Sequence, residues 1–547
     1  MRHLLLLVAI LAASLPAAAQ AEQATASTPQ PTAEQWREDL RFMVAEMKSR
    51  HANLYHHVPQ AQFDAAVADL DRRIPELQRN QVIVGMMRIA AMVGDGHTRV
   101  DPRKDKAFGF RSLPLQLYWF DDGIFVRSVR PDLRGLLGAR VEAIGGIPVA
   151  EAIRRTSEIV SNETITGPRL MVPLYLVMPD VLQALGLSGD REAATMTFSR
   201  DGKRWTQRVP VGDVAALWPP DTDASFITPD GWLDARTGPR PLWLQAPLDY
   251  HRLVALPDKH ALYAQLNMVT DTRDESLRAY GQRILDQARA SNPRALILDL
   301  RLDQGGNGDL RNGLVANLIR AEDPDTRLFV LVGRGTFSAS EFILDDMDRL
   351  TDAVFIGEPA SSRPTGYGDA YRSILPNSGI GVRTSIKYWQ SGQDMRPYVP
   401  IDIAAPLTFA DYVAGRDPAL EAALAYQPRP TLGEQLVEAG KSGGPPAALK
   451  TAVAFVDDPT HRYSDVEWKL IVAEQVALSQ KQGPAALEVA RWSVGRFPRN
   501  SDLATVHALV AMREGRKDEA RKATDAALSI DPSNRSAQSL KEELGRK

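Results

Sequence analysis

Cysteine is absent from this sequence of 547 residues. Its absence excludes disulfide bonds, cysteine nucleophiles, thiolate metal sites and a lipidated N-terminal cysteine. A charge excess of one sign is also missing, because 65 Lys and Arg residues oppose 68 Asp and Glu residues and leave a net charge of −3. A nearly neutral chain has no electrostatic basis for binding nucleic acid or an anionic membrane surface. The hydrophobic content of 44% is that of an ordinary globular protein with a sizeable core.

Long hydrophobic runs are missing as well, apart from the start of the chain. The opening "MRHLLLLVAILAASLPAAAQ" has a basic start, a short apolar run and an A-x-A ending at Ala19. This pattern predicts a cleaved secretory signal peptide over residues 1–19, followed by a polar, proline-bearing linker over 20–32. No later stretch approaches the roughly 20 apolar residues that a membrane span needs. We therefore expect a periplasmic or secreted protein without a membrane span.

The rest of the chain divides by its hydrophobic periodicity. Apolar residues three and four apart predict a helical domain over 33–100, which ends in "VGDGHTRV". Short strands with Asp-Gly turns predict a β-rich segment over 101–235. From 236 to 427, strands such as "RALILDLR" alternate with helices, which is typical of βαβ units around a mainly parallel sheet.

The C-terminal part is expected to be helical and repetitive. A linker is expected over 428–445, ending in the stretch "GKSGGP", and helices are expected over 446–547. Pro498 and Pro532 lie 34 residues apart, as do Asn500 and Asn534. This period and the closing Asp-Pro turn are typical of tetratricopeptide repeats. We therefore expect tetratricopeptide-like repeats that bind a protein partner.

Three motifs could carry chemistry, and the first is "GRGTFSASE". There an apolar strand passes through a glycine-rich turn into a helix, which exposes a hydroxyl beside backbone N–H groups. The alternative is that Ser338 or Ser340 merely caps the helix. A serine nucleophile needs a base, which "GDGHT" can supply through His97. The third motif, "LDLRLDQGGNG", is a buried strand followed by a loop at the sheet edge where ligands bind, and it lacks the Gly-Lys-Ser/Thr ending of a phosphate loop.

Together and in this order, the three motifs resemble the S41 serine peptidases. That family includes the C-terminal processing or tail-specific proteases, the tricorn core and relatives of the interphotoreceptor retinoid-binding protein. The similarity covers roughly residues 33–425. It implies an α/β fold with an S41-type (ClpP/crotonase-like) βαβ catalytic core. The stretch "LLGARVEAIGGIPVAEAI" also resembles the second half of a PDZ-like module, which implies a PDZ-like insertion in the β-rich segment.

The resemblance assigns roles to individual residues. It implies that Ser338 is the nucleophile and that His97 is the general base, as in the tricorn-like branch. The oxyanion hole would consist of the backbone N–H groups of Ala339 and Gly306, with Gly305 as the alternative to Gly306. The resemblance implies no cofactor and no metal.

The sequence departs from the processing proteases at their lysine base. The corresponding place reads "SSRPTGYGD", where Arg363 stays protonated and cannot act as a base. A Ser–Lys dyad would require Lys387 to arrive from elsewhere. We therefore expect a Ser–His pair oriented by a carboxylate.

Four carboxylates could orient the histidine. Asp394 is the candidate, because the tricorn-like branch uses an acid late in the domain. Asp369 in "GYGDAY" is the alternative, while Asp402 and Glu341 rank lower.

The sequence thus predicts an exported serine peptidase that hydrolyses peptide bonds in peptide or protein substrates through an acyl-enzyme. The alternative is a catalytically inactive protein of the same fold that binds peptides or hydrophobic ligands. The histidines of "HANLYHHV", His51, His56 and His57, lack the HExxH spacing of a metalloprotease. We expect them to be surface or helix-end residues.

Overall fold

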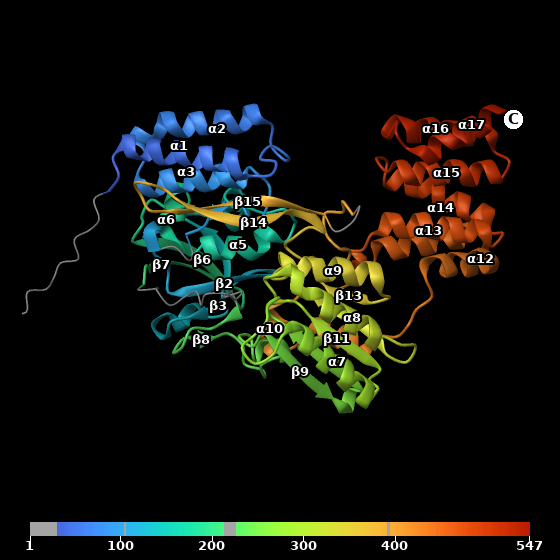
Figure 1. Cartoon of the computed structure of the whole chain (residues 1–547), viewed down its shortest axis with the longest axis horizontal. Helices are drawn as coiled ribbons and strands as arrows, with labels where there is room; N and C mark the ends of the chain where they lie inside the picture. The colour runs from blue at the N-terminus through green and yellow to red at the C-terminus, as the bar shows by residue number, and fades with distance from the viewer. Residues whose placement is uncertain (1–29, 103–105, 213–225, 391–393, 547) are drawn as a thin grey trace, which may run out of the picture.

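The computed structural model describes residues 30–102, 106–212, 226–390 and 394–546. The expected signal peptide lies outside the described residues, as does all of the expected linker except its last three residues. Figure 1 shows helices α1–α3 above a β-rich region, an α/β domain beside them, and a stack of C-terminal helices set to one side. Within the described ranges, no helix is long and apolar enough to cross a membrane.

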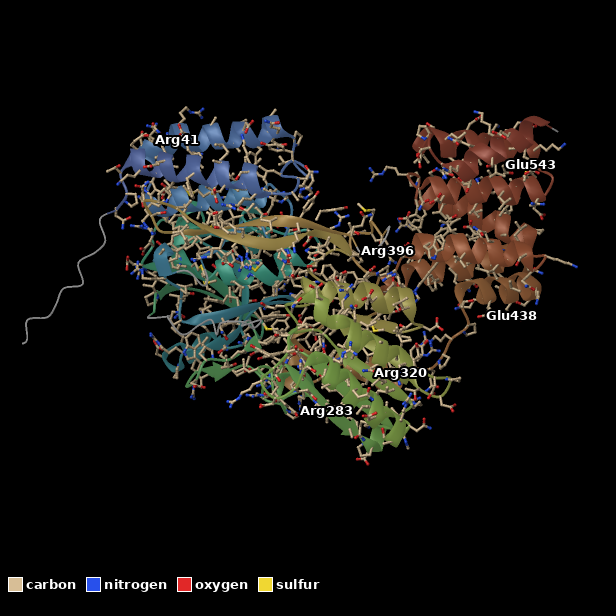
Figure 2. The ribbon with its side chains drawn as sticks, in the orientation of Figure 1. Arg41, Arg283, Arg320, Arg396, Glu438 and Glu543 are labelled. Atoms are coloured by element: carbon tan, nitrogen blue, oxygen red, sulfur yellow. The ribbon has the colours of Figure 1, made fainter. Side chains whose placement is uncertain are left out.

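The N-terminal region consists of α1 (Ala33–Arg50), α2 (Gln60–Arg73) and α3 (Arg79–Ala91). A capping box between Thr32 and Gln35 starts α1, because each side chain satisfies a backbone N–H of the other. Helix α1 buries Leu40, Met43 and Met47, which recur at helical spacing, against the core. Charged side chains such as Arg41 project from its outer face (Figure 2).

The β-rich region forms an antiparallel sheet in the order β2-β3-β4-β6-β7, with β5 paired to β4 and β8 paired to β3. Its elements are β2 (Leu115–Phe120), β3 (Gly123–Val129), β4 (Arg140–Ile144), β5 (Ile147–Pro148), α4 (Val149–Ser157), α5 (Gly167–Tyr175), α6 (Pro179–Ala184), β6 (Ala193–Arg200), β7 (Lys203–Pro210) and β8 (Leu233–Asp234). The PDZ-like character of this region stays a prediction.

The α/β domain is built on a six-stranded sheet in the order β16-β13-β12-β11-β10-β9. All neighbours are parallel except β9 and β10, and the predicted α/β class is confirmed. The elements are β9 (His251–Leu256), β10 (Ala261–Leu266), α7 (Leu277–Ser291), β11 (Ala295–Asp299), α8 (Arg311–Ala321), β12 (Arg327–Val332), α9 (Ala339–Leu350), β13 (Val354–Gly357), β16 (Ile403–Ala404), α10 (Phe409–Ala414) and α11 (Pro418–Ala425). Strand β11 is buried along its whole length, because helices cover both faces of the sheet.

A third sheet joins the N-terminal region to the α/β domain. Strands β14 (Thr365–Ile374) and β15 (Gly381–Gln390) form a long hairpin that extends from the α/β domain beneath α1–α3 (Figure 1). The short β1 (Arg99–Val100) pairs antiparallel with β15. At the hairpin turn, the buried Asp39 accepts hydrogen bonds from the backbone N–H groups of Asn377 (2.8 Å) and Ser378 (2.9 Å). The segment just after "GDGHT" is thereby fixed to the domain that carries the serine.

The C-terminal helices begin earlier than expected. They are α12 (Leu432–Asp457), α13 (Val466–Ser479), α14 (Gly483–Arg496), α15 (Ser501–Arg513), α16 (Lys517–Ile530) and α17 (Arg535–Arg546). Most of the expected linker over 428–445 is therefore helical, because a capping box between Thr431 and Glu434 starts α12 there. The glycine-proline stretch only kinks this helix at Gly444.

The 34-residue spacing corresponds to a repeated structural feature. Asn500 accepts the backbone N–H of Leu503, and Asn534 accepts that of Ala537, so both asparagines cap the start of a helix. The tetratricopeptide assignment stays a prediction.

The close packing of α7 on α8 gives a stability prediction. A Cβ at Gly281 on α7 would lie 2.8 Å from the Cα of Leu314 on α8. We expect Gly281→Ala to lower the free energy of unfolding by about 1–3 kcal/mol, because the two helix backbones must move apart. Chemical denaturation followed by circular dichroism measures the change.

Gly495→Ala is the matched control, since Gly495 also lies within a helix but has no atom near the place that a Cβ would take. We expect it to be neutral or to stabilise the C-terminal helices by up to about 1 kcal/mol. Equal effects of the two changes on their respective unfolding transitions would contradict the close contact of α7 with α8.

Candidate active site

Ser338 occupies a strained turn between β12 and α9. Its φ of 58° and ψ of −122° are a conformation that non-glycine residues rarely adopt and that costs about 1–3 kcal/mol. It sits at the N-cap position of α9, yet its side chain makes no capping hydrogen bond. Simple helix capping therefore does not explain Ser338, and its hydroxyl remains available.

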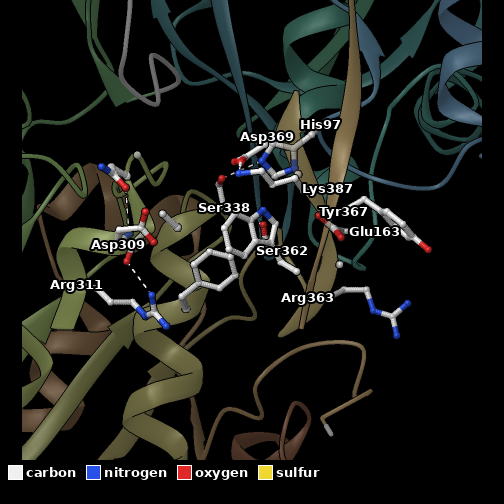
Figure 3. A pocket seen from close by; sticks show the side chains of 18 residues that line it. His97, Glu163, Asp309, Arg311, Ser338, Ser362, Arg363, Tyr367, Asp369 and Lys387 are labelled. Atoms are coloured by element: carbon white, nitrogen blue, oxygen red, sulfur yellow. Dashed lines mark hydrogen bonds and ion pairs between the residues drawn. The ribbon is translucent and has the colours of Figure 1, made fainter. Parts of the chain in front are cut away.

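His97 meets this hydroxyl from the loop before β1. Its Nε2 lies 2.9 Å from Ser338 Oγ, although 241 positions separate the two residues (Figure 3). The imidazole stacks on Phe337 with 4.5 Å between ring centroids. The structure thus places the two residues within hydrogen-bond distance, with the serine O–H able to donate to Nε2.

Burial controls the ionisation of His97. Desolvation lowers the pKa of its imidazole to about 4, so the ring is neutral at neutral pH. Its Nδ1 is buried and has no hydrogen-bond partner among the described residues. A neutral ring that accepts the serine proton at Nε2 carries its own proton on Nδ1.

The expected orienting acid does not reach this nitrogen. Asp394 instead accepts hydrogen bonds from the backbone N–H (2.9 Å) and the guanidinium of Arg396. Partial burial opposes ionisation of Asp394, but the contacts with Arg396 outweigh it and lower the pKa of the carboxyl. Asp369, the alternative, forms an ion pair with Lys387 at 2.6 Å.

Lys387 and Arg363, the other two basic residues considered in the sequence analysis, are each bound to a group other than Ser338. The hydrogen bond and charge of Asp369 raise the pKa of Lys387, which favours its protonated form. Arg363 donates from Nη2 to the carbonyl oxygen of Met395 at 3.0 Å. Among these groups, His97 is the one held next to Ser338 in a basic form.

The glycine-rich loop after β11 packs directly against the serine turn. A Cβ at Gly305 would lie 2.7 Å from both Ser338 Cβ and the Ala339 nitrogen. The Gly305 N–H already donates to Asp303 Oδ1 at 2.8 Å, which favours Gly306 as the oxyanion donor. Ala339 is the first residue of α9, so its N–H has no partner within the helix. These two amides are the candidates for the oxyanion hole.

Sequence reasoning missed Ser362. Its Oγ accepts the backbone N–H of Ser338 at 2.7 Å and so supports the strained turn. The residue is buried and lines the same cleft. Its position directly before Arg363, where the processing proteases carry their base, was the available signal.

Two acids near the site were also missed. Glu163 lines the cleft, and burial raises the pKa of its carboxyl well above the usual value. Nothing in the sequence pattern around Glu163 indicates this position. Asp95 lies beneath the histidine loop and forms a hydrogen bond with His51. His51 is the C-cap of α1, a helix end as expected, although it is buried. His56 and His57 are exposed as expected. The signal for Asp95 was its place within "GDGHT".

The cleft around Ser338 opens to solvent. Its walls come from the loop after β11, the start of α9 and the β14–β15 hairpin (Figure 3). Phe342 and Trp389 form an aromatic wall, with 5.3 Å between their ring centroids. Across the described ranges, no group of three or more His, Asp or Glu side chains could hold a metal ion. The arrangement fits acyl transfer to a serine hydroxyl.

Comparisons with known proteins give no match among family models and none among curated proteins. Among solved structures, a mutant of CPAF superposes with a TM-score of 0.51 at 11% identity, covering 73% of this chain and 99% of that one. This chain has the fold of CPAF. The likeness supports the expected α/β fold.

Two further structures superpose less well. Mature CPAF covers 78% of this chain and 99% of its own at 12% identity, with a TM-score of 0.46. The photosystem II D1 C-terminal processing protease covers 70% and 98% at 15% identity, with a TM-score of 0.33.

The packing of Gly305 on the serine turn can be tested by Gly305→Ala. The new Cβ would displace the Ser338 turn and the Ala339 amide. We expect the rate at which a fluorophosphonate probe labels Ser338 to fall by about 10²-fold or more, as for loss of an oxyanion donor.

Gly146→Ala is the control, because Gly146 has a similar positive φ (80° against 94°) but open space where a Cβ would lie. It carries the same backbone strain without the collision. Equal labelling rates for the two variants would contradict a role for this packing.

Proposed function

We propose that this protein is a serine peptidase of S41 type that cleaves peptide bonds through an acyl-enzyme. The observation that carries the proposal is the 2.9 Å contact between His97 Nε2 and Ser338 Oγ on a strained strand-to-helix turn. A neutral imidazole and adjacent backbone N–H groups supply the base and the oxyanion donors that such chemistry needs.

The proposed reaction begins when His97 Nε2 removes the proton of Ser338 as Oγ attacks the substrate carbonyl carbon. The N–H groups of Gly306 and Ala339 hold the tetrahedral oxyanion. His97 then gives its proton to the leaving amine, which breaks the peptide bond and leaves an ester on Ser338. Water, deprotonated by His97, hydrolyses the ester and restores the serine.

Export and partner binding complete the proposal. The signal peptide over residues 1–19 would direct the chain to the periplasm or the exterior. The helices from α12 to α17 would bind a protein partner, as expected for tetratricopeptide-like repeats. Substrates would be peptides or unfolded proteins whose backbone can enter the cleft.

A non-catalytic binding protein on the same fold is the second candidate. The observation that favours it is the buried Nδ1 of His97, which has no carboxylate partner in the described part of the chain. The intact Ser–His contact favours the peptidase.

Hydrolysis of a mixed set of peptides and unfolded proteins distinguishes these candidates. We expect Ser338→Ala to abolish turnover and His97→Ala to lower it by about 10²–10⁴-fold. Lys387→Ala is the control and should retain turnover, because Lys387 is paired with Asp369 rather than with the serine. Equal turnover in parent, Ser338→Ala and His97→Ala would refute the assignment.

The pH dependence of kcat/KM gives a second prediction. The base must be neutral to accept the serine proton, and the pKa of His97 is lowered to about 4. Activity should therefore be lost as the pH falls through about 4, well below the usual histidine value of about 6.5. An acid limb near pH 6.5, in a protein that stays folded, would contradict the lowered pKa of His97.

A further inference from the structure

Asp95 is a buried carboxylate directly beneath the catalytic histidine loop. Its Oδ1 accepts the backbone N–H groups of His97 (2.8 Å) and Thr98 (2.6 Å), and the hydroxyl of Ser385 on β15 (2.8 Å). Its Oδ2 lies 2.9 Å from His51 Nε2. Four contacts from three parts of the chain therefore converge on one side chain that is fully buried.

The tautomer of His51 follows from its second contact. The backbone N–H of Asn53 donates to His51 Nδ1 at 3.0 Å, so Nδ1 is unprotonated and Nε2 carries the proton. A neutral His51 thus donates to Asp95. The pair needs no charge on the histidine, and the negative charge stays on Asp95.

Asp95 remains ionised in spite of its burial. Desolvation opposes the charge, but the contacts with His51, Thr98 and Ser385 outweigh it and lower the pKa of Asp95. A charge held away from water is weakly screened, so it acts strongly on neighbouring groups. For His97, Asp95 is the strongest of the nearby charges that favour protonation.

The reaction needs such a charge, because His97 becomes an imidazolium while the tetrahedral intermediate exists. In Ser-His-Asp enzymes a carboxylate bonded to Nδ1 stabilises this cation. Here Nδ1 has no partner among the described residues, and neither Asp394 nor Asp369 is bonded to it. Asp95 is the ionised group that accepts a hydrogen bond from the backbone N–H of His97.

We propose that Asp95, held by His51 and Ser385, is the positioning residue of this site and supplies the negative charge that stabilises protonated His97. Asp95 fixes the histidine loop through the backbone N–H groups of His97 and Thr98. This inference rests on the proposed peptidase function, but its first readout, the protonation of His97, does not.

Other charged and titratable groups face these two residues. Those around His97 are Arg99 on β1, Arg383 on β15 and Asp369 on β14. Those around Asp95 are His51, His56, Glu163 and Tyr367. Since none of these groups is altered in the Asp95→Asn test below, a change in His97 titration reports on Asp95.

The test follows His97 by NMR in the full chain labelled with ¹³Cε1-histidine, with its signal assigned by its loss in His97→Ala. In the parent, His97 should be half protonated near pH 4. In Asp95→Asn the ring should stay neutral at that pH, because loss of a nearby charge shifts a pKa by about one unit or more. At pH 7 the same variant should show kcat lowered about 10–100-fold with KM unchanged.

A double variant separates charge from hydrogen bonding. In Asp95→Asn the new NH₂ group faces the Nε2–H of His51, so two donors meet. Combining it with His51→Gln supplies an amide oxygen that can accept from the asparagine. The double variant should regain thermal stability and keep the low kcat, and it carries the test if the single variant does not fold.

Asp180→Asn is the matched control, because Asp180 on α6 is also almost buried (6% exposed) and accepts a backbone N–H from Arg111. It should leave kcat and the titration of His97 unchanged. The inference is overturned if His97 in Asp95→Asn titrates as in the parent, or if the double variant regains parental kcat. If Ser338→Ala loses turnover but His97 titrates in Asp95→Asn as it does in the parent, this inference is refuted and the proposed peptidase function is not.

Discussion

The candidate site depends on the contact between two loops that follow neighbouring parallel strands. Because β11 and β12 are neighbouring parallel strands, the loop after β11 and the turn after β12 leave the same edge of the sheet. The backbone N–H of Phe337 donates to the carbonyl oxygen of Asp303 (3.0 Å), and Thr336 Oγ1 donates to that of Leu300 (2.8 Å). These bonds, with the N–H of Ser338 on Ser362, hold the serine in a conformation that it would not adopt alone.

The histidine comes from a different part of the fold. The pairing of β1 with β15 fixes the loop that carries His97 to the same hairpin that lines the cleft. Asp95 adds a second attachment through Ser385 on β15. The proposed base and the proposed nucleophile are therefore positioned by separate elements, whose relative placement is set by a hairpin long enough to reach both (Figure 1).

Local patterns predicted the parts of the site that depend on local structure. The buried strand β11, the strand-to-helix turn at Ser338 and the histidine within "GDGHT" each have a sequence signature. Asp394 was expected to orient the histidine, but Arg396 two residues later binds it, and spacing in the sequence does not report that competition. Ser362 and His51 meet their partners only through tertiary packing, so no local pattern identified their roles. The helix over the expected linker was missed because the glycines and prolines of this segment were interpreted as helix breakers, although a capping box at Thr431 starts a helix there.

A crystal structure of the full chain with a peptide boronic acid tests the central claim most directly, since boronates add to an activated serine and mimic the tetrahedral intermediate. We predict a bond from boron to Ser338 Oγ, with one boronate oxygen within about 3 Å of the Gly306 and Ala339 nitrogens. An adduct on another residue, or a boronate oxygen directed away from both amides, would contradict the proposed site.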